Sequence, residues 1–296
     1  MNLERAGEFR IGGDLPICRF GFGAMRLTGP GIWGPPTDLH AAQAVLRRVV
    51  ELGINFIDTA DVYGPGDNER LIRDTLAPYP ARLVIATKGG LVRGGPATAQ
   101  NPGMGTDNSE AHLRHAVEGS LRNLGVERID LYQLHRVDPA VPIEETMGVL
   151  ARLRDEGKIR HIGLSEVAVD HIERARSEVE IATVQNLYNL AQRKHDDVID
   201  YCARHGIGFI PFYPLKIGDL ADSEALKSLA AREQVTPALI ALAWLFRRSP
   251  VIVPIPGTSS LDHLEENAEA CRVTLTARDM ETLDVLSRPQ PEASGS

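Results

Sequence analysis

The chain has 296 residues, of which 43% are hydrophobic and 24% are charged, and these ordinary globular values exclude a disordered protein. The formal net charge of −8 at pH 7 argues against a general nucleic-acid binder, because affinity for phosphate backbones comes from clustered Lys and Arg. The longest apolar runs are too short to span a bilayer, so we expect no membrane partner.

The N-terminus and the cysteines favour a cytoplasmic protein. No apolar core follows a basic head at the N-terminus, as it would in a secretion signal. Cys18, Cys202 and Cys271 are odd in number, scattered and without metal-type spacing, so we expect reduced thiols and no metal site. The sequence does not restrict the assembly beyond a monomer or a small homo-oligomer.

Taken in order, the chain predicts one continuous domain over residues 1–288, followed by a flexible tail over 289–296. Residues 8–20 predict a β-hairpin that turns at Gly13-Asp14. Short apolar strands then alternate with amphipathic helical patterns. The eight strand candidates are residues 21–25, 54–58, 83–88, 129–135, 159–165, 181–185, 208–212 and 251–255. The helical patterns are residues 38–50, 69–76, 109–124, 143–155, 170–175, 197–205, 223–247 with a break at Thr236-Pro237, and 261–270.

This alternation predicts an α/β fold, a (β/α)8 TIM barrel with an N-terminal β-hairpin. A doubly wound sheet is the alternative. Its glycine-rich phosphate turn is missing, since Gly21-Phe22-Gly23 is not followed by the third glycine of that fingerprint. In a barrel, polar residues at the carboxyl ends of the strands face the active site. Here those ends carry Asp58, Lys88, His135, Ser165 and Gln185.

Two of these side chains suggest an ion pair, because a lysine that closes an apolar strand needs an anion beside it and Asp58 is the obvious candidate. The pair can be purely structural. The functional interpretation adds Tyr63, in the loop before a helix that Asn68 is expected to cap at its N-terminus. A phenol near an ammonium group should have its pKa lowered from about 10 toward neutrality, so that it can donate a proton.

A proton donor of this kind suits a reaction that delivers a proton to a carbonyl oxygen. His135 can hydrogen-bond the same oxygen, or it can be a structural histidine. No nucleophilic cysteine or serine constellation is visible, so the hydride equivalent must come from a cofactor.

The motifs 53–64, Asn68-Glu69, Thr87-Lys88 and 132–136 resemble those of the aldo-keto reductase superfamily, and the resemblance extends from the hairpin to Asn267. The Asp, Tyr, Lys and His of the family's tetrad map onto Asp58, Tyr63, Lys88 and His135. The resemblance implies that a nicotinamide cofactor transfers hydride to an aldehyde or ketone while Tyr63 protonates its oxygen. It also implies that Lys88 and Asp58 tune Tyr63, that His135 orients the carbonyl, and that the partner is a small carbonyl compound.

The resemblance also implies where the nicotinamide half of the cofactor binds. Ser165 and Gln185 would hold the carboxamide, and Phe212 would stack on the ring. Leu215 would lie in the pyrophosphate loop. Met25 and Arg26 would lie under the cofactor. Glu166 stands where the family usually has the Asn of a Ser-Asn pair, so the sequence assigns it no role.

For the adenosine half, the resemblance implies that Thr258 and Ser259 hold a 2′-phosphate at a helix start and that Asn267 reads the adenine. Many relatives have a Lys at Gly257 and an Arg at His263, so this site carries less positive charge here. We still expect NADPH in preference to NADH, with NADH possible. The alternative is that residues 258–260 only cap the following helix.

Residues 25–36 and 256–260 resemble a bacterial branch of the family that includes pyridoxal reductases, also called pyridoxine 4-dehydrogenases. Branch resemblance does not fix a substrate. Trp33 is expected either to wall the substrate pocket or to cover the barrel rim. Two alternatives from other classes are a nicotinamide-binding regulatory subunit with little turnover and a scaffold barrel that binds no nucleotide.

Overall fold

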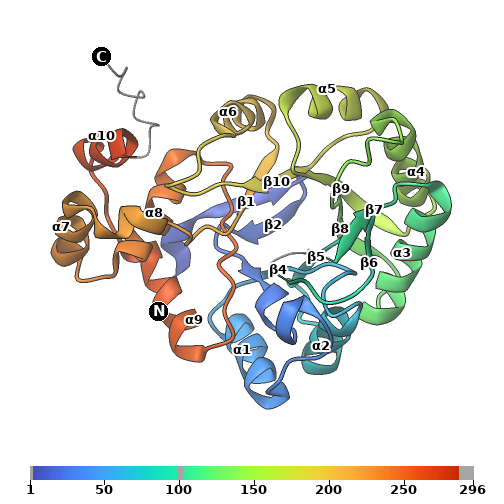
Figure 1. The fold of residues 1–296 in the computed structure, drawn as a ribbon, viewed down its shortest axis with the longest axis horizontal. Coiled ribbons are helices and arrows are strands. Elements are labelled where there is room, and N and C mark those ends of the chain that lie inside the picture. The colour runs from blue at the N-terminus through green and yellow to red at the C-terminus, as the bar shows by residue number, and fades with distance from the viewer. Residues whose placement is uncertain (1–2, 99–102, 287–296) are drawn as a thin grey trace.

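The computed structural model describes residues 3–98 and 103–286, and its centre is a curved parallel sheet surrounded by helices (Figure 1). The sheet has the order β11-β10-β9-β8-β5-β4-β3. Its strands are β3 (Phe22–Gly23), β4 (Phe56–Asp58), β5 (Val84–Gly89), β8 (Ile129–Leu134), β9 (Ile159–Ser165), β10 (Thr183–Leu187) and β11 (Gly208–Phe212). They match seven of the eight strands predicted from the sequence. The tail predicted over 289–296 lies outside the described residues.

The eighth predicted strand, residues 251–255, closes the barrel between β11 and β3. Phe209 N donates to Val251 O at 2.8 Å, and Val253 N donates to Phe209 O at 2.8 Å. On the other side Gly21 N donates to Pro254 O at 3.0 Å. Pro254 has no N–H to donate, which interrupts the ladder and explains why this segment lacks regular strand pairing. The predicted (β/α)8 barrel is therefore confirmed, with one irregular strand.

The connecting helices form the outer layer (Figure 1). They are α1 (Leu39–Glu51), α2 (Asp67–Leu76), α3 (Glu110–Leu124), α4 (Ile143–Asp155), α5 (Val169–Glu178), α6 (Asp196–His205), α7 (Glu224–Glu233), α8 (Pro237–Arg248), α9 (Leu261–Glu269) and α10 (Ala277–Leu286). Helix α10, which packs with α7 beside α8, was not predicted. None of the helices in the described ranges has the length and apolar character needed to cross a bilayer.

The N-terminal hairpin closes one end of the barrel. Its strands β1 (Glu8–Ile11) and β2 (Leu15–Cys18) are antiparallel, as predicted. Ile11 and Ile17 are buried against side chains from the amino ends of the barrel strands, among them Phe56 and Val84. This contact leaves the carboxyl ends of the strands as the open end, where barrel enzymes carry their active sites.

Two local features differ from the sequence prediction. A second hairpin, β6 (Leu91–Arg93) and β7 (Met104–Thr106), follows β5 and was not predicted. Asn68 does not cap a helix, because α2 already begins at Asp67, after Gly66 with a φ of 80°. Asn68 is fully buried instead. Its Oδ1 accepts from Thr59 Oγ1 at 2.7 Å, and its Nδ2 donates to the carbonyls of Ala24 and Leu27, each at 3.0 Å.

Candidate active site

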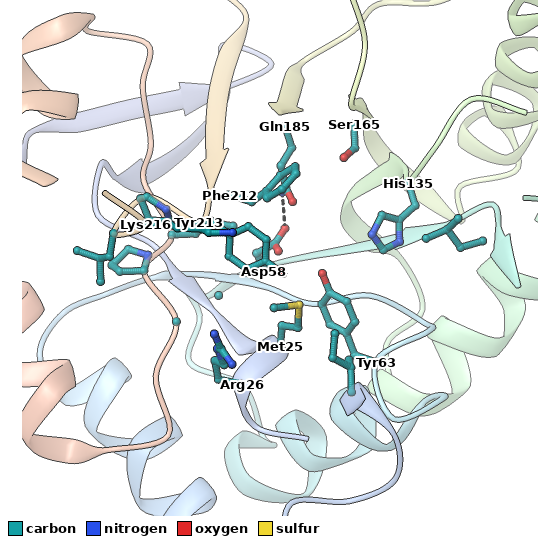
Figure 2. A pocket seen from close by; sticks show the side chains of 18 of the residues that line it. Met25, Arg26, Asp58, Tyr63, His135, Ser165, Gln185, Phe212, Tyr213 and Lys216 are labelled. Atoms are coloured by element: carbon teal, nitrogen blue, oxygen red, sulfur yellow. Dashed lines mark hydrogen bonds between the residues drawn. The ribbon is translucent and has the colours of Figure 1, made fainter. Parts of the chain in front are cut away.

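A cavity of about 910 Å³ opens at the carboxyl end of the barrel, and Figure 2 shows side chains from several strands and loops pointing into it. Strand-end residues, the β6–β7 hairpin, residues 255–257 and the loops that follow β3, β4 and β11 form its wall. The lining residues are Gly23, Met25, Arg26, Ile32, Asp58, Tyr63, Leu91, Met104, His135, Arg136, Ser165, Gln185, Phe212, Tyr213, Pro214, Leu215, Lys216, Ile255, Pro256 and Gly257. Nine residues predicted as catalytic or cofactor-binding lie in this wall: Met25, Arg26, Asp58, Tyr63, His135, Ser165, Gln185, Phe212 and Leu215.

The predicted ion pair between Lys88 and Asp58 lies behind this wall. Lys88 is completely buried, and its Nζ lies 2.6 Å from Asp58 Oδ2 and 2.8 Å from the carbonyl oxygen of Thr59. Asp58 Oδ1 accepts from Gln185 Nε2 at 2.8 Å and from Gln133 Nε2 at 3.2 Å. Burial lowers the pKa of Lys88, and the carboxylate of Asp58 opposes that shift. Such a pair persists in an interior because its remaining donors and acceptors are satisfied.

Tyr63 is held against this pair by the loop that follows β4. Tyr63 N donates to Ala60 O at 3.1 Å, and Asp61 N donates to Lys88 O at 3.2 Å, so the loop follows the end of β5. The Tyr63 ring centroid lies 5.3 Å from Lys88 Nζ and 6.0 Å from the centroid of the His135 ring, at an interplanar angle of 82°. The hydroxyl points into the cavity between Asp58 and His135 (Figure 2).

The expected lowering of the Tyr63 pKa is wrong for the protein as the structure describes it. Burial raises the pKa of Tyr63 well above its ordinary value, and the negative charge of Asp58 adds to the increase. Lys88 does not reverse this shift, because its charge is compensated by Asp58 at 2.6 Å. The phenol is therefore neutral and carries its proton at neutral pH.

His135 lies at the end of β8 with its ring in the cavity wall. Its pKa is well below the ordinary value of 6.5, first because burial disfavours the charged ring and then because Lys88 and Arg136 are positive. The imidazole is thus neutral at pH 7. Its Nδ1 is buried and has no hydrogen-bond partner among the residues that the structure describes.

Ser165, at the end of β9, is linked to a residue for which the sequence suggested no role. Arg136 Nη1 donates to Ser165 Oγ at 3.0 Å and to the carbonyl oxygen of His135 at 2.6 Å. The guanidinium carbon lies 5.7 Å from the centroid of the Phe212 ring. Arg136 therefore connects the ends of β8 and β9 with the aromatic residue at the end of β11.

The remaining predicted cofactor residues lie beyond the cavity. Thr258, Ser259, His263 and Asn267 are not part of its wall, although Gly257, directly before them, is. Thr258 Oγ1 accepts from Ser260 N at 3.0 Å, and Ser260 Oγ caps α9 by accepting from His263 N at 3.4 Å. The helix-capping alternative is therefore observed at Ser260, whereas the phosphate and adenine contacts stay predictions.

An apolar group forms the other rim of the cavity. Leu91 and Met104 from the β6–β7 hairpin pack with Met25, Ile32 and the Tyr63 ring. Trp33 is not among the lining residues. It is 39% exposed, and the guanidinium carbon of Arg93 lies 5.6 Å from the centroid of one of its rings.

A model of the aldo/keto reductase family matches residues 19–288. The chain belongs to this family. It is 43% identical over 282 residues to pyridoxine 4-dehydrogenase of Escherichia coli, covering 93% of this chain and 97% of the relative. It is 47% identical over 285 residues to an uncharacterised oxidoreductase of Schizosaccharomyces pombe, covering 96% and 91% of the two chains.

Solved structures of other aldo-keto reductases share the fold. A glycerol dehydrogenase from Gluconobacter oxydans superposes with a TM-score of 0.85 and 28% identity, covering 98% of this chain and 99% of that one. An aldo-keto reductase from Klebsiella pneumoniae, solved in complex with NADPH, gives a TM-score of 0.79 at 27% identity over 97% of each chain. The similarity covers nearly the whole chain, so it includes the barrel end that carries the cavity.

Sequence reasoning missed three contributors to the site of this aldo-keto reductase. Gln133 lies two residues before His135, which directly follows β8. Side chains two residues apart on a strand point to the same face, so Gln133 could have been predicted to face the site as well. Arg136 directly follows a predicted site residue, but no local pattern shows that it reaches Ser165. The β6–β7 hairpin is built from two three-residue strands, which are too short to give a recognisable pattern.

Proposed function

We propose that this aldo-keto reductase reduces an aldehyde or a ketone to an alcohol, with NADPH as the hydride donor and Tyr63 as the proton donor. The observation that carries the proposal is the convergence of the Tyr63 hydroxyl and the neutral His135 imidazole on one cavity, in front of the buried Lys88–Asp58 pair. Family membership supports the reaction class.

The cavity suits the nicotinamide half of a dinucleotide together with a small substrate. Its volume of about 910 Å³ lies at the upper end of the ordinary range for ligand sites. Gly23 and Gly257 form part of the floor, and a Cβ added to Gly257 would lie 2.5 Å from the carbonyl oxygen of Gly23. Nδ1 of His135, which has no hydrogen-bond partner among the described residues, supports a polar ligand at this place.

Some residues of the chain would hold the cofactor, and others would take part in the reaction. Ser165 and Gln185 would hold the carboxamide, and Oε1 of Gln185 accepts no hydrogen bond within the described residues. Phe212 would lie against the nicotinamide ring, and Leu215 beside the pyrophosphate. Met25 and Arg26 would lie under the cofactor (Figure 2). When bound, the cofactor supplies the hydride.

The adenosine half would lie at the start of α9. Thr258 and Ser259 would bind a 2′-phosphate through hydroxyls and backbone amides, since the N-terminus of a helix favours anions. Asn267 would contact the adenine, and His263 occupies a position where many relatives have Arg. The NADPH complex of the Klebsiella relative supports NADPH as the preferred cofactor.

Tyr63 and His135 would do the chemistry at the substrate. Tyr63 holds its proton at neutral pH and can pass it to the carbonyl oxygen as negative charge develops there. Neutral His135 can donate an N–H to the same oxygen without bringing a positive charge that would need burial. The Lys88–Asp58 pair positions the phenol from behind.

The 43% identity to pyridoxine 4-dehydrogenase makes pyridoxal a specific candidate substrate. The test is oxidation of NADPH and of NADH, followed by absorbance, over aldehydes, ketones, pyridoxal and sugars. We expect turnover with at least one carbonyl compound and a higher kcat/KM with NADPH. Tight nucleotide binding without turnover would support a regulatory subunit instead, and absence of any nucleotide binding would support a scaffold barrel.

A further inference from the structure

The cavity wall contains a positive charge that the reaction described above does not use. Arg136 lines the cavity, and Nη1 makes both of its hydrogen bonds, to His135 O and Ser165 Oγ. Nε and Nη2 make no hydrogen bond within residues 3–98 and 103–286, and neither is buried away from the cavity. No carboxylate of the same residues lies within ion-pair distance of the guanidinium.

The surroundings compensate this charge only in part. Burial lowers the pKa of Arg136, yet a guanidinium keeps its charge in proteins. Glu166 is the acidic group that counteracts this shift most, but it forms no ion pair with the guanidinium among the described residues, and its Oε1 accepts from Leu187 N at 2.5 Å. Asp58, the one acid in the cavity wall, is paired with Lys88. A partly buried guanidinium of this kind favours an anionic ligand, because its planar fork matches a carboxylate or phosphate group.

The position of Arg136 places such an anion close to the reacting carbonyl. Arg136 is adjacent in sequence to His135, and its Nη1 lies 2.6 Å from the His135 carbonyl oxygen. Its charge affects the pKa of both His135 and Tyr63, so all three groups share one part of the cavity. The other Arg and Lys side chains in the wall among the described residues, Arg26 and Lys216, lie on the opposite side of the cavity from His135 (Figure 2).

We propose that the substrate is a carbonyl compound that carries a carboxylate or a phosphate, and that Arg136 binds this anionic group through its free N–H groups. This proposal rests on the proposed carbonyl reduction and adds the class of substrate to it. Arg136 is then a specificity-determining residue. The anion would stand a few bonds from the carbonyl carbon, since Arg136 and His135 lie on one strand end.

A competing role is that Arg136 only orients Ser165 for the cofactor, through the bond of 3.0 Å. The two roles differ in what a substitution changes. Loss of an anion contact lowers kcat/KM for charged substrates alone. Loss of Ser165 orientation weakens cofactor binding and affects charged and neutral substrates equally.

The test compares matched substrates with the wild-type protein and with Arg136→Gln and Arg136→Lys. Succinic semialdehyde and its methyl ester differ in one carboxylate, and glyceraldehyde 3-phosphate and glyceraldehyde differ in one phosphate. We expect the wild type to prefer one charged member by at least about 30-fold in kcat/KM, which equals about 2 kcal/mol. Whichever pair shows the preference identifies carboxylate or phosphate as the anion.

In Arg136→Gln the preference, taken as the ratio of kcat/KM for the charged and the neutral member, should fall at least about 10-fold. Arg136→Lys keeps the charge but not the fork, so it should retain an intermediate preference. A wild type that reduces neutral and charged members equally well would overturn the proposal while leaving the carbonyl reductase function intact. If kcat/KM falls equally for both members in Arg136→Gln and NADPH binds more weakly, the role of Arg136 is to orient Ser165, and the anion proposal is overturned. If no carbonyl compound is reduced at all, the proposed function itself fails, and the anion proposal fails with it.

Discussion

Lys88 Nζ lies 2.6 Å from Asp58 Oδ2, and both side chains are almost completely removed from water. Removing one partner leaves an uncompensated charge in the interior, so Asp58→Asn should lower the free energy of unfolding by about 3–5 kcal/mol. The double variant Asp58→Asn/Lys88→Met should lose less than the sum of the single changes, because neither charge remains. Urea unfolding of the four proteins measures this coupling.

The exposed pair Arg174–Glu144 provides the control. Glu144→Gln should have a far smaller effect, because solvent screens charges at the surface. If the losses of unfolding free energy in the two single variants added up to the loss in the double variant, the two side chains would not interact as a buried ion pair.

His135 makes the stability depend on pH. Its folded-state pKa lies well below 6.5, because burial and nearby cations disfavour protonation, whereas the unfolded chain titrates near 6.5. Below that pH the unfolded state binds a proton that the folded state does not, so stability falls as pH falls. The loss between pH 7.5 and 5.5 should be about 1.4 kcal/mol smaller in His135→Gln than in the wild type.

Urea unfolding at the two pH values checks this difference. His40 is exposed on α1, so His40→Gln should leave the wild-type loss unchanged. If His135→Gln lost as much stability between pH 7.5 and 5.5 as the wild type does, the folded protein would protonate the His135 ring as readily as the unfolded chain does.

Gly257 should not tolerate a side chain. A Cβ there would lie 2.5 Å from Gly23 O, a backbone atom in the cavity floor that cannot move aside cheaply. Gly257→Ala should therefore cost about 1–3 kcal/mol of stability and weaken NADPH binding. Gly119, inside α3, has open space where a Cβ would be added, so Gly119→Ala should stabilise by about 0.5–1 kcal/mol. Thermal unfolding of both variants measures whether each change raises or lowers the stability. A lower stability in Gly119→Ala, or an unchanged stability in Gly257→Ala, would contradict the packing described at these two glycines.

Most of the fold could be predicted because each barrel strand is a short apolar run between a helix and a polar strand end. The strand 251–255 was also found this way, although Pro254 disrupts its pairing. The β6–β7 hairpin and α10 could not be predicted. The strands of the β6–β7 hairpin are three residues long, which is too short for a pattern. The buried positions of α10 are Asp279 and Leu283, and these two do not mark an apolar face that a pattern would detect.

Nine of the predicted site residues line the cavity, but their electrostatic environment could not be predicted from the sequence. Asp58, Tyr63, His135 and Gln185 meet because parallel strands end at one edge. The direction of the Tyr63 pKa shift was wrong, because it depends on how deeply the phenol is buried and on how fully Asp58 compensates Lys88. Neither quantity is local in sequence.

The raised pKa of Tyr63 leads to a pH dependence that differs between the two directions of the reaction. Reduction needs the protonated phenol, which persists well above neutral pH, so kcat/KM for an aldehyde should stay level from about pH 6 to pH 9. Oxidation of the alcohol needs the phenolate, so its rate should rise with pH across the same range. Initial rates in both directions measure the profiles. A decline of the reduction rate centred near pH 7 would show that the phenol has a near-neutral pKa after all.

The most direct test of the central claim is the single-turnover rate of NADPH oxidation in Tyr63→Phe, with a good aldehyde substrate at saturation. Loss of the proton donor should lower this rate by about 100-fold to 10,000-fold. NADPH affinity, measured by quenching of Trp fluorescence, should change less than about 2-fold, because the phenol hydroxyl points into the cavity between Asp58 and His135 and Tyr63 is not among the residues proposed to hold the cofactor (Figure 2). A rate within about 3-fold of the wild type, with NADPH bound normally, would contradict the assignment of Tyr63 as the proton donor.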